Sequence, residues 1–232
     1  MTAIALPDHL RRFPCMHPWI GSRYRDRRHK RLLVVGESHY LPPESTIHHN
    51  PARWYRGSQA DLSEEEVRWA STTGNITGRW YRGHRIYQAI QTEVTAVLTR
   101  NNVTPDPFPL NHMAYCNYFL RPAPESGGSM QGHARQQDLQ VAEQVLTWFI
   151  LRHRPELLIV TSRFAGHHAE RVTREHGIPS ITTPHPGTRW WNTVTQSYGN
   201  IRGRDLFASF LREQQWLAPS PSRTEPVSTM SR

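Results

Sequence analysis

Short apolar runs bounded by turn residues constrain the fold of this chain more than any other feature. The clearest is LLVV at 32–35, which ends at Gly36. Comparable runs lie at 113–119 and 157–160, and a shorter, less apolar run lies at 178–183. A run without polar alternation is typical of a strand that is buried on both faces, as in a parallel sheet. We therefore expect four strands at these positions.

Helical patterns separate the expected strands. Between 134 and 152, apolar residues recur at spacings of three and four, and Pro155 follows the end of the pattern. Further helices are expected at 84–99, 164–176 and 204–217. This order of elements, joined by right-handed crossovers, predicts a three-layer α/β/α sandwich with a central, mostly parallel four-stranded sheet.

The length and composition predict one domain over 1–217, because 232 residues with 37% hydrophobic content can bury one substantial core. Residues 218–232 are rich in Pro and Ser, which predicts a disordered tail. No run approaches the roughly 18–20 apolar residues of a membrane helix, and the N-terminus lacks the order of a signal peptide. We therefore expect a cytoplasmic protein that does not enter a membrane.

The cysteines and the charge narrow the set of partners. Cys15 and Cys116 are too few for a disulfide framework or a four-cysteine metal or iron–sulfur site, so no metal or cofactor is expected. The net charge is +9, and Lys30 is the only lysine, so 27 of the 28 basic residues are arginines. A GC-rich genome would favour arginine over lysine, but arginine also presents a forked, permanently charged donor to phosphate. Arginine clusters at 23–31 and 79–85 strengthen the interpretation of a nucleic-acid partner.

Three polar motifs follow the expected strands, on the edge of the sheet where ligands bind in such folds. They are VGESHY at 35–40, YCNYFLRP at 115–122 and TPHPGTRWW at 183–191. Together they resemble three motifs of the uracil-DNA glycosylase superfamily: the GEAPG or GQDPY loop, the strand-ending TNVVKCRPP segment, and the HPS motif with its wedge loop. The segment 154–165 resembles a structural segment of the same family. The resemblance covers about residues 32–210 and implies a DNA glycosylase.

The first motif resembles the loop that positions the hydrolytic water in this family. Ser38 stands where the most active branch carries aspartate, and a serine cannot act as a carboxylate base at neutral pH. Water activation would then fall to Glu37, to His39, or to a weak hydrogen bond from Ser38. His185 in the third motif would stabilise the negative charge on the departing base. The prolines on both sides of His185 restrict its backbone.

The resemblance also implies residues that bind the flipped base. Asn117 would pair with the base edge, because a carboxamide offers both a donor and an acceptor. Tyr40 corresponds to the aromatic residue that blocks the methyl group of thymine. Trp80 or Tyr81 would stack on the flipped base.

The DNA backbone would meet the third motif. Gly187 and Thr188 would present backbone N–H groups to a phosphate, and Arg189 would contact the DNA beside them. Trp190 or its neighbour Trp191 would fill the gap in the base stack. Arg121, in the second motif, is also expected to contact DNA.

The excised base stays open at this point. It would be a uracil-type lesion or a bulkier modified cytosine, such as glucosylated hydroxymethylcytosine of phage DNA, in which case the enzyme would act in antiviral defence. No lysine lies near the motifs, so we expect a monofunctional, monomeric enzyme that uses water rather than a Schiff base.

Two other functions remain alternatives. Gly36-Glu37-Ser38 is close to the GDS motif of SGNH esterases, with Ser38 as nucleophile and His185 as base. However, position 182 is Thr rather than the Asp that this family requires, and position 40 breaks the G-x-S-x-G pattern. A catalytically inactive nucleic-acid-binding protein is the second alternative, suggested by Ser38.

Overall fold

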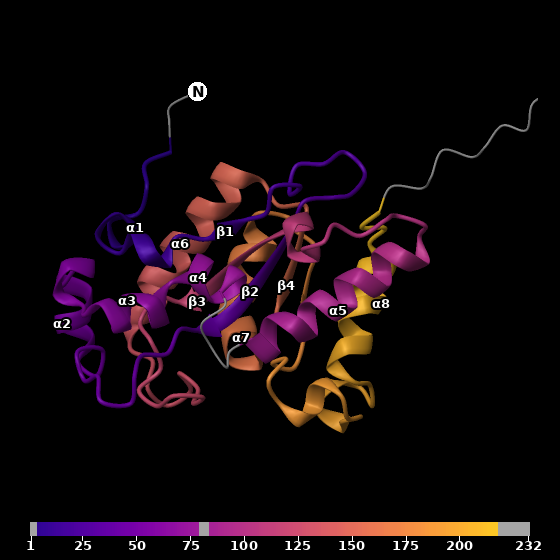
Figure 1. Cartoon of the computed structure of the whole chain (residues 1–232). Helices are drawn as coiled ribbons and strands as arrows, with labels where there is room; N and C mark the ends of the chain where they lie inside the picture. Colours follow the sequence, from indigo (N-terminus) through magenta and orange to yellow (C-terminus); the bar gives the residue numbers. More distant parts are fainter. Residues whose placement is uncertain (1–3, 79–83, 218–232) are drawn as a thin grey trace, which may run out of the picture.

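The computed structural model describes residues 4–78 and 84–217, and its centre is a five-stranded sheet with the order β1-β3-β2-β4-β5 (Figure 1). The strands are β1 (Trp19–Ile20), β2 (Leu32–Ser38), β3 (Met113–Phe119), β4 (Leu157–Val160) and β5 (Ser180–Thr182). The pairs β3–β2, β2–β4 and β4–β5 are parallel, and β1 pairs with β3 in the antiparallel direction. The predicted mostly parallel sheet is confirmed, with β1 as an additional strand at the edge.

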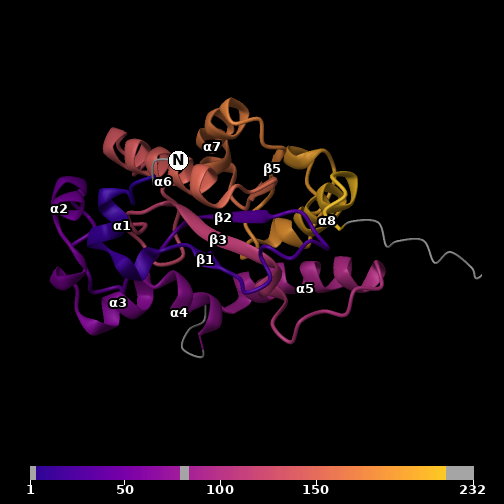
Figure 2. The ribbon, with the colours of Figure 1, turned by 90° about the horizontal axis from the view of Figure 1, so that it is seen from above.

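Two layers of helices cover the sheet, which confirms the predicted sandwich (Figure 2). On one face, α6 (Gln136–His153) and α7 (Arg163–Glu175) bury apolar side chains such as Leu146 and Phe149 against β2, β3 and β4. On the other face, α5 (His84–Arg100) and α8 (Gly203–Glu213) bury Val94 and Phe207 against the same strands. The central strands are therefore buried on both faces, as their uninterrupted apolar sequences require.

The segment between β2 and α5 forms short helices that were not predicted. They are α2 (Pro51–Arg56), α3 (Glu64–Ala70) and α4 (Thr72–Thr77). Each begins at a side chain that accepts a backbone N–H bond at the helix start, namely Asn50, Ser63 and Ser71. Together with α1 (Asp8–Arg12), α2 and α3 enclose a third apolar cluster, in which Trp54 and Tyr55 are buried.

Short 3₁₀ turns complete the described chain: η1 (Pro14–Met16), η2 (Gln59–Asp61), η3 (Pro109–His112), η4 (Arg189–Trp191) and η5 (Gln196–Tyr198). No helix among the described residues is long and apolar enough to cross a membrane. The tail predicted at 218–232 lies outside the described residues.

Arg121 does not lie on the surface, so the prediction that it contacts DNA is wrong. The residue is 1% exposed, and its side chain forms two hydrogen bonds of 2.8 Å with the carboxylate of Asp138 in α6. The same guanidinium group donates to the backbone oxygens of His48 and His133, and Asp138 also accepts from the hydroxyl of Tyr55. Arg121 thereby joins the end of β3 to α6 and to two loops beside the carboxyl end of the sheet.

Breaking this buried ion pair should destabilise the fold strongly. The substitution Asp138→Ala leaves the guanidinium group of Arg121 buried without its counter-charge, which we expect to lower the free energy of unfolding by about 3–5 kcal/mol. Glu64→Ala, which breaks the exposed pair between Glu64 and Arg68, serves as the control and should have little effect. Chemical denaturation measures both, and equal losses for the two variants would contradict the structural role of the Arg121–Asp138 pair.

Candidate active site

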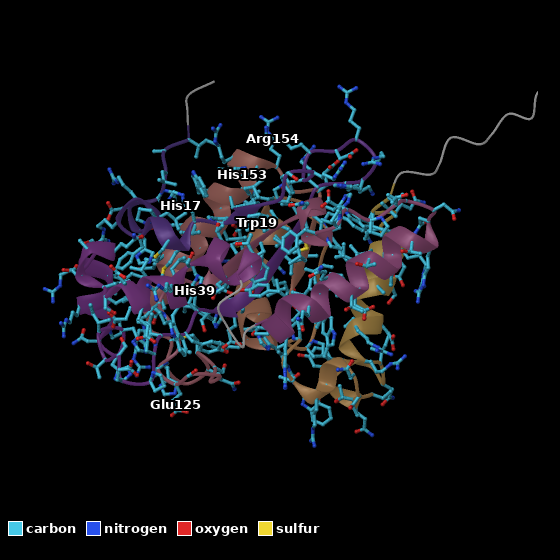
Figure 3. All side chains as sticks on the ribbon, viewed as in Figure 1. His17, Trp19, His39, Glu125, His153 and Arg154 are labelled. Carbon is cyan, nitrogen blue, oxygen red and sulfur yellow. The ribbon has the colours of Figure 1, made fainter. Side chains whose placement is uncertain are left out.

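The three predicted motifs meet at one cavity beyond the carboxyl ends of the parallel strands. Five predicted residues line this cavity: Ser38 at the end of β2, His39 and Tyr40 directly after it, Asn117 near the end of β3, and His185 after β5. Figure 3 labels His39 within this part of the molecule. The cavity measures about 60 Å³, which is small beside the roughly 300–1,000 Å³ of pockets that hold drug-sized ligands.

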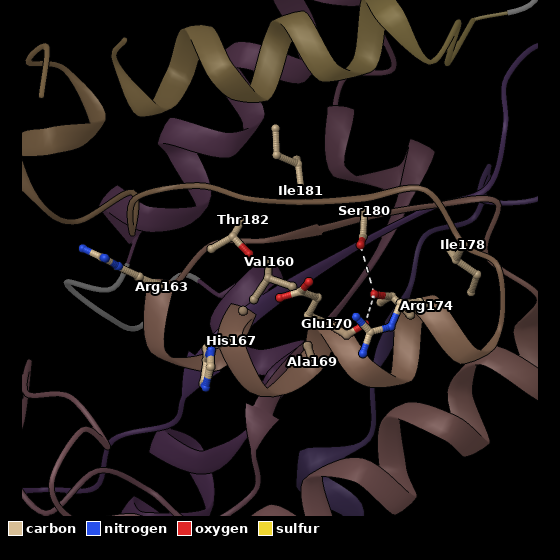
Figure 4. Close-up of a pocket in the computed structure, with 12 residues that line it drawn as sticks. Val160, Arg163, His167, Ala169, Glu170, Arg174, Ile178, Ser180, Ile181 and Thr182 are labelled. Atoms are coloured by element: carbon tan, nitrogen blue, oxygen red, sulfur yellow. Dashed lines mark hydrogen bonds between the residues drawn. The ribbon is translucent and has the colours of Figure 1, made fainter. Parts of the chain in front are cut away.

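A larger groove of about 630 Å³ lies between α7 and the edge strand β5 (Figure 4). Arg163, His167 and Arg174 line it together with Glu170, and a hydrogen bond of 3.0 Å joins the hydroxyls of Ser180 and Thr173 at its wall. None of the predicted site residues lies in this groove. The smaller cavity is the better candidate because polar groups from separate strands converge on it.

Asn117 is held by its neighbour on the same strand. Tyr115 and Asn117 are two residues apart, so their side chains share one face of β3, and the hydroxyl of Tyr115 donates to Oδ1 of Asn117 at 3.1 Å. The amide nitrogen of Asn117 has no partner among the described residues, so its N–H groups are available to a ligand. The amide therefore presents a fixed donor edge to the cavity.

Gly36 makes this arrangement possible. It pairs with Asn117 in the register of β2 and β3. A Cβ atom at position 36 would lie 2.0 Å from the hydroxyl oxygen of Tyr115 and 2.3 Å from Oδ1 of Asn117. Because both distances are far below contact distance, only glycine leaves room for the two side chains at the floor of the cavity.

His185 is held in one neutral tautomer. The backbone N–H of Gly187 donates to Nδ1 of His185 at 3.2 Å, so Nδ1 is an acceptor and the proton of the neutral ring lies on Nε2. Burial lowers the pKa of His185 from its ordinary value of 6.5, and the negative charge of Glu37 opposes this shift. At neutral pH the ring therefore offers an N–H donor without carrying a formal charge.

Glu37 does not line the cavity but lies close enough to His185 to affect its charge. Its Oε1 accepts from the hydroxyl of Ser129 and the backbone N–H of Met130, and its Oε2 accepts from the hydroxyl of Ser162. These three hydrogen bonds fix the carboxylate between the loop before α6 and the start of α7. This arrangement suits an electrostatic role beside His185 better than the removal of a proton from a group in the cavity.

Ser38 and His39 occupy the cavity wall in different ways. The hydroxyl of Ser38 is buried and makes no hydrogen bond with the described residues, so it can bind a water or ligand. His39 is 3% exposed, and its Nε2 lies 3.4 Å from the hydroxyl of Thr72. Burial lowers the pKa of His39 to about 4, which makes its ring a weak base.

Sequence reasoning identified only some of the aromatic residues that line the cavity. Tyr40 turns its hydroxyl away to the backbone oxygen of Gly128, at 3.2 Å, and its ring borders the cavity. Trp69 lines the cavity too, whereas two other aromatic residues of the segment between β2 and α5, Trp54 and Tyr55, are buried in the third cluster. The predicted stacking residues at positions 80 and 81 lie outside the described residues.

Three further lining residues were missed: Asn75, Ile86 and Tyr87. Asn75 lies in α4 and the other two lie in α5. The helical period could have placed Ile86 and Tyr87 on the sheet-facing side of α5, but no sequence signal marks that side as part of a cavity.

The loop after His185 leaves its polar residues exposed and buries one tryptophan. The hydroxyl of Thr188 donates to the backbone oxygen of His185 at 2.8 Å, which closes a tight turn around Gly187. Arg189 is exposed, and its guanidinium carbon lies 3.9 Å from the ring centre of Trp190. Trp191 is 2% exposed and packs on Phe207, so of the two candidate wedge residues only Trp190 is accessible.

Among the described residues, no group of three or more His, Cys, Asp or Glu side chains is arranged to hold a metal ion. No protein-family model matches this chain, and no curated protein sequence matches it. The resemblance of the three motifs to the uracil-DNA glycosylase superfamily therefore stays an expectation, to be tested through the chemistry of the cavity.

Proposed function

We propose that this protein is a monofunctional DNA glycosylase that hydrolyses the N-glycosidic bond of a pyrimidine flipped out of DNA. One observation carries the proposal: a neutral imidazole with its proton on Nε2 and a carboxamide with a fixed donor edge face the same small cavity. A flipped base is read by hydrogen bonds to its edge, and its departure as an anion requires a donor at the developing charge. An enzyme of this kind would act as a monomer on DNA in the cytoplasm.

His185 would stabilise the leaving group. When the bond between C1′ of the sugar and N1 of the base breaks, the electron pair stays on the base and the negative charge spreads to its carbonyl oxygen. The Nε2–H group of His185 would donate to that oxygen. Because the ring is neutral and prepositioned, the hydrogen bond strengthens as charge develops and needs no proton transfer.

Water would complete the reaction at C1′. Its oxygen bonds to C1′, and one of its protons ends on the released base, which leaves an abasic site. The unpartnered hydroxyl of Ser38 would position this water. Glu37, held beside His185 by three hydrogen bonds, would favour the positive charge that develops on the sugar. His39, whose pKa burial lowers to about 4, is not the water activator in this scheme.

The size of the cavity favours a small base. With about 60 Å³ bounded by Tyr40, Trp69 and Tyr87, it suits a uracil-type lesion better than a glucosylated cytosine. A glucosylated base, and with it a role against phage DNA, would require this wall to open.

The esterase alternative lacks the contact on which it depends. A serine nucleophile needs a base within hydrogen-bond distance, but the hydroxyl of Ser38 makes no hydrogen bond with the described residues. Nδ1 of His185 accepts from a backbone N–H group rather than donating to a carboxylate. An ester-hydrolysis assay should therefore give no turnover.

A panel of modified duplexes tests the proposal. Duplexes and single strands carrying uracil, hydroxymethyluracil or glucosylated hydroxymethylcytosine are incubated with the protein and treated with alkali to cleave abasic sites. We expect release of uracil or hydroxymethyluracil and no covalent product on borohydride trapping. Release of the glucosylated base alone would overturn the size argument. DNA binding without any base release would favour the inactive binder and overturn the glycosylase.

Removing the imidazole should abolish most of the activity. We expect His185→Ala to lower the rate of base release by a few orders of magnitude and to leave DNA affinity nearly unchanged. His167→Ala, outside the cavity on α7, is the matched control. Because the pKa of His185 lies below 6.5, the wild-type rate should be constant from pH 7 to 8 and fall on acidification as the ring gains a proton. A rate that rises on acidification would contradict a neutral donor.

Tyr115 should act as a positioning residue for Asn117. The substitution Tyr115→Phe removes the hydroxyl that fixes the amide, so we expect kcat to fall about tenfold, in line with the loss of one hydrogen bond of roughly 1.4 kcal/mol. Discrimination between uracil and cytosine should weaken, because the amide group of Asn117 can then rotate and exchange its donor and acceptor. Tyr118→Phe is the control, since Tyr118 lies on the same strand but packs in the opposite layer. Unchanged discrimination in Tyr115→Phe would remove this role.

A further inference from the structure

The first of the two arginine clusters that suggested a nucleic-acid partner, at 23–31, lies far from the candidate active site. The loop at 21–31 precedes β2 and therefore lies at the amino end of the parallel strands, whereas the cavity lies at their carboxyl end. Figure 3 shows His153 and Arg154 at this amino end, at the opposite end of the molecule from Glu125. The seven residues of β2, at about 3.3 Å each, separate the two sites by roughly 20 Å.

Two elements contribute exposed arginines at the amino end. The hydroxyl of Tyr24 donates to the backbone oxygen of His153 at 3.3 Å, and Nε of Arg31 donates to the backbone oxygen of Arg154 at 2.5 Å. These bonds hold the 21–31 loop against the carboxyl end of α6. We call the resulting exposed set the amino-end patch, and its members are Arg25, Arg27, Arg152 and Arg154.

The patch keeps its positive charge. The neighbouring carboxylates are already paired, Asp26 with Arg28 and Glu156 with Arg31. Among the described residues, the four guanidinium groups of the patch have no hydrogen-bond or ion-pair partner. The carboxyl end of α6 favours cations at positions 152 and 154 through the helix dipole, but it does not account for the exposed arginines of the loop.

The pKa of the neighbouring His153 reflects the same concentration of positive charge. Burial lowers the pKa of His153, and the charges of Arg25 and Arg152 lower it further. Both guanidinium groups therefore lie close to one imidazole although they come from different elements. Like charges held this near one another cost free energy unless a polyanion offsets them.

We infer that the amino-end patch is a second nucleic-acid site, which binds the phosphate backbone of a DNA duplex other than the one presented to the cavity. Arginine forks match phosphate oxygens without reading sequence. One straight duplex seated across the carboxyl end of the strands does not also reach their amino end, because DNA is stiff over about 150 base pairs and resists a sharp bend within a short site. The protein would thus hold two DNA segments at once. This inference does not depend on base release.

A bridging experiment tests the second site. Two sets of unmodified duplexes of about 15 base pairs, one with a fluorescent donor and one with an acceptor, are mixed with the full chain at low salt. Energy transfer reports two duplexes on one protein, and sedimentation establishes that the complex contains a single chain. We expect transfer with the wild type and its loss as salt rises to about 0.2 M.

Neutralising the amino-end patch should remove the bridging of two duplexes and leave the binding of one duplex and the stability of the fold unchanged. The variant Arg25→Gln/Arg27→Gln/Arg152→Gln/Arg154→Asn should still bind one duplex and melt at the wild-type temperature, since all four side chains are exposed. Asn is chosen at position 154 because its backbone φ is +51°. Energy transfer should disappear, and the salt slope of total binding should fall by about one for each arginine that contacts a phosphate.

A control with the same charge change decides the interpretation. Arg11→Gln/Arg53→Gln/Arg56→Gln/Arg68→Gln removes four exposed arginines of α1, α2 and α3 and should retain most of the transfer. Equal loss in both variants would overturn a specific site, as would transfer that survives in the patch variant. Patch-dependent binding to phosphatidylserine vesicles without any bridging of DNA would also overturn it. Bridging without base release would leave this site standing and reject only the proposed enzyme.

Discussion

The buried ion pair between Arg121 and Asp138 is the constraint on which the carboxyl end of the sheet depends. A charge taken out of water must find a counter-charge and further hydrogen bonds, and Arg121 finds both in Asp138 and two backbone oxygens. Those oxygens belong to the loops after β2 and before α6. The ion pair therefore fixes the two loops that carry Tyr40 and two of the three partners of Glu37. Arg121, in the second of the three motifs, thus supports the candidate site through buried contacts rather than from the surface.

Hydrogen bonds from neighbouring residues likewise orient the polar groups in and beside the cavity. Asn117 is oriented by Tyr115, His185 by the backbone of Gly187, and Glu37 by two serine hydroxyls and one N–H group. For Asn117 and His185, the second residue uses one hydrogen-bonding atom and leaves another for the cavity, whereas both carboxylate oxygens of Glu37 are held by partners outside its lining. Such preorganisation is what a site needs in order to stabilise charge without rearranging at the moment of reaction.

The sequence predicted the elements that periodicity specifies. The central strands and the four long helices lie where apolar runs and helical spacing placed them, because burial on one or two faces leaves a repeating pattern. The strand β1 was missed because two residues carry no period, and α2, α3 and α4 were missed because their limits depend on side-chain caps. Arg121 was assigned wrongly because its partner lies 17 residues away, a pairing that spacing alone does not reveal. The three motifs do converge on one cavity, since parallel strands end at a common edge, whereas Asn75 and Ile86 reach it only through tertiary packing.

The cavity and the exposed arginines differ in charge, so the groups suited to chemistry are not those suited to attracting a polyanion. Among the described residues that line the cavity there is no Asp, Glu, Lys or Arg, and burial lowers the pKa values of His39 and His185, so the ordinary state of the site is neutral. A neutral, desolvated cavity strengthens each hydrogen bond to a developing anion, but it offers nothing to attract a polyanion from solution. In the proposed enzyme, this attraction would come from exposed arginines outside the cavity lining, such as Arg189 in the loop after His185 and the four of the amino-end patch. Because the four patch arginines lie on different elements from the cavity, their variants would weaken the proposed DNA binding without changing the proposed chemistry.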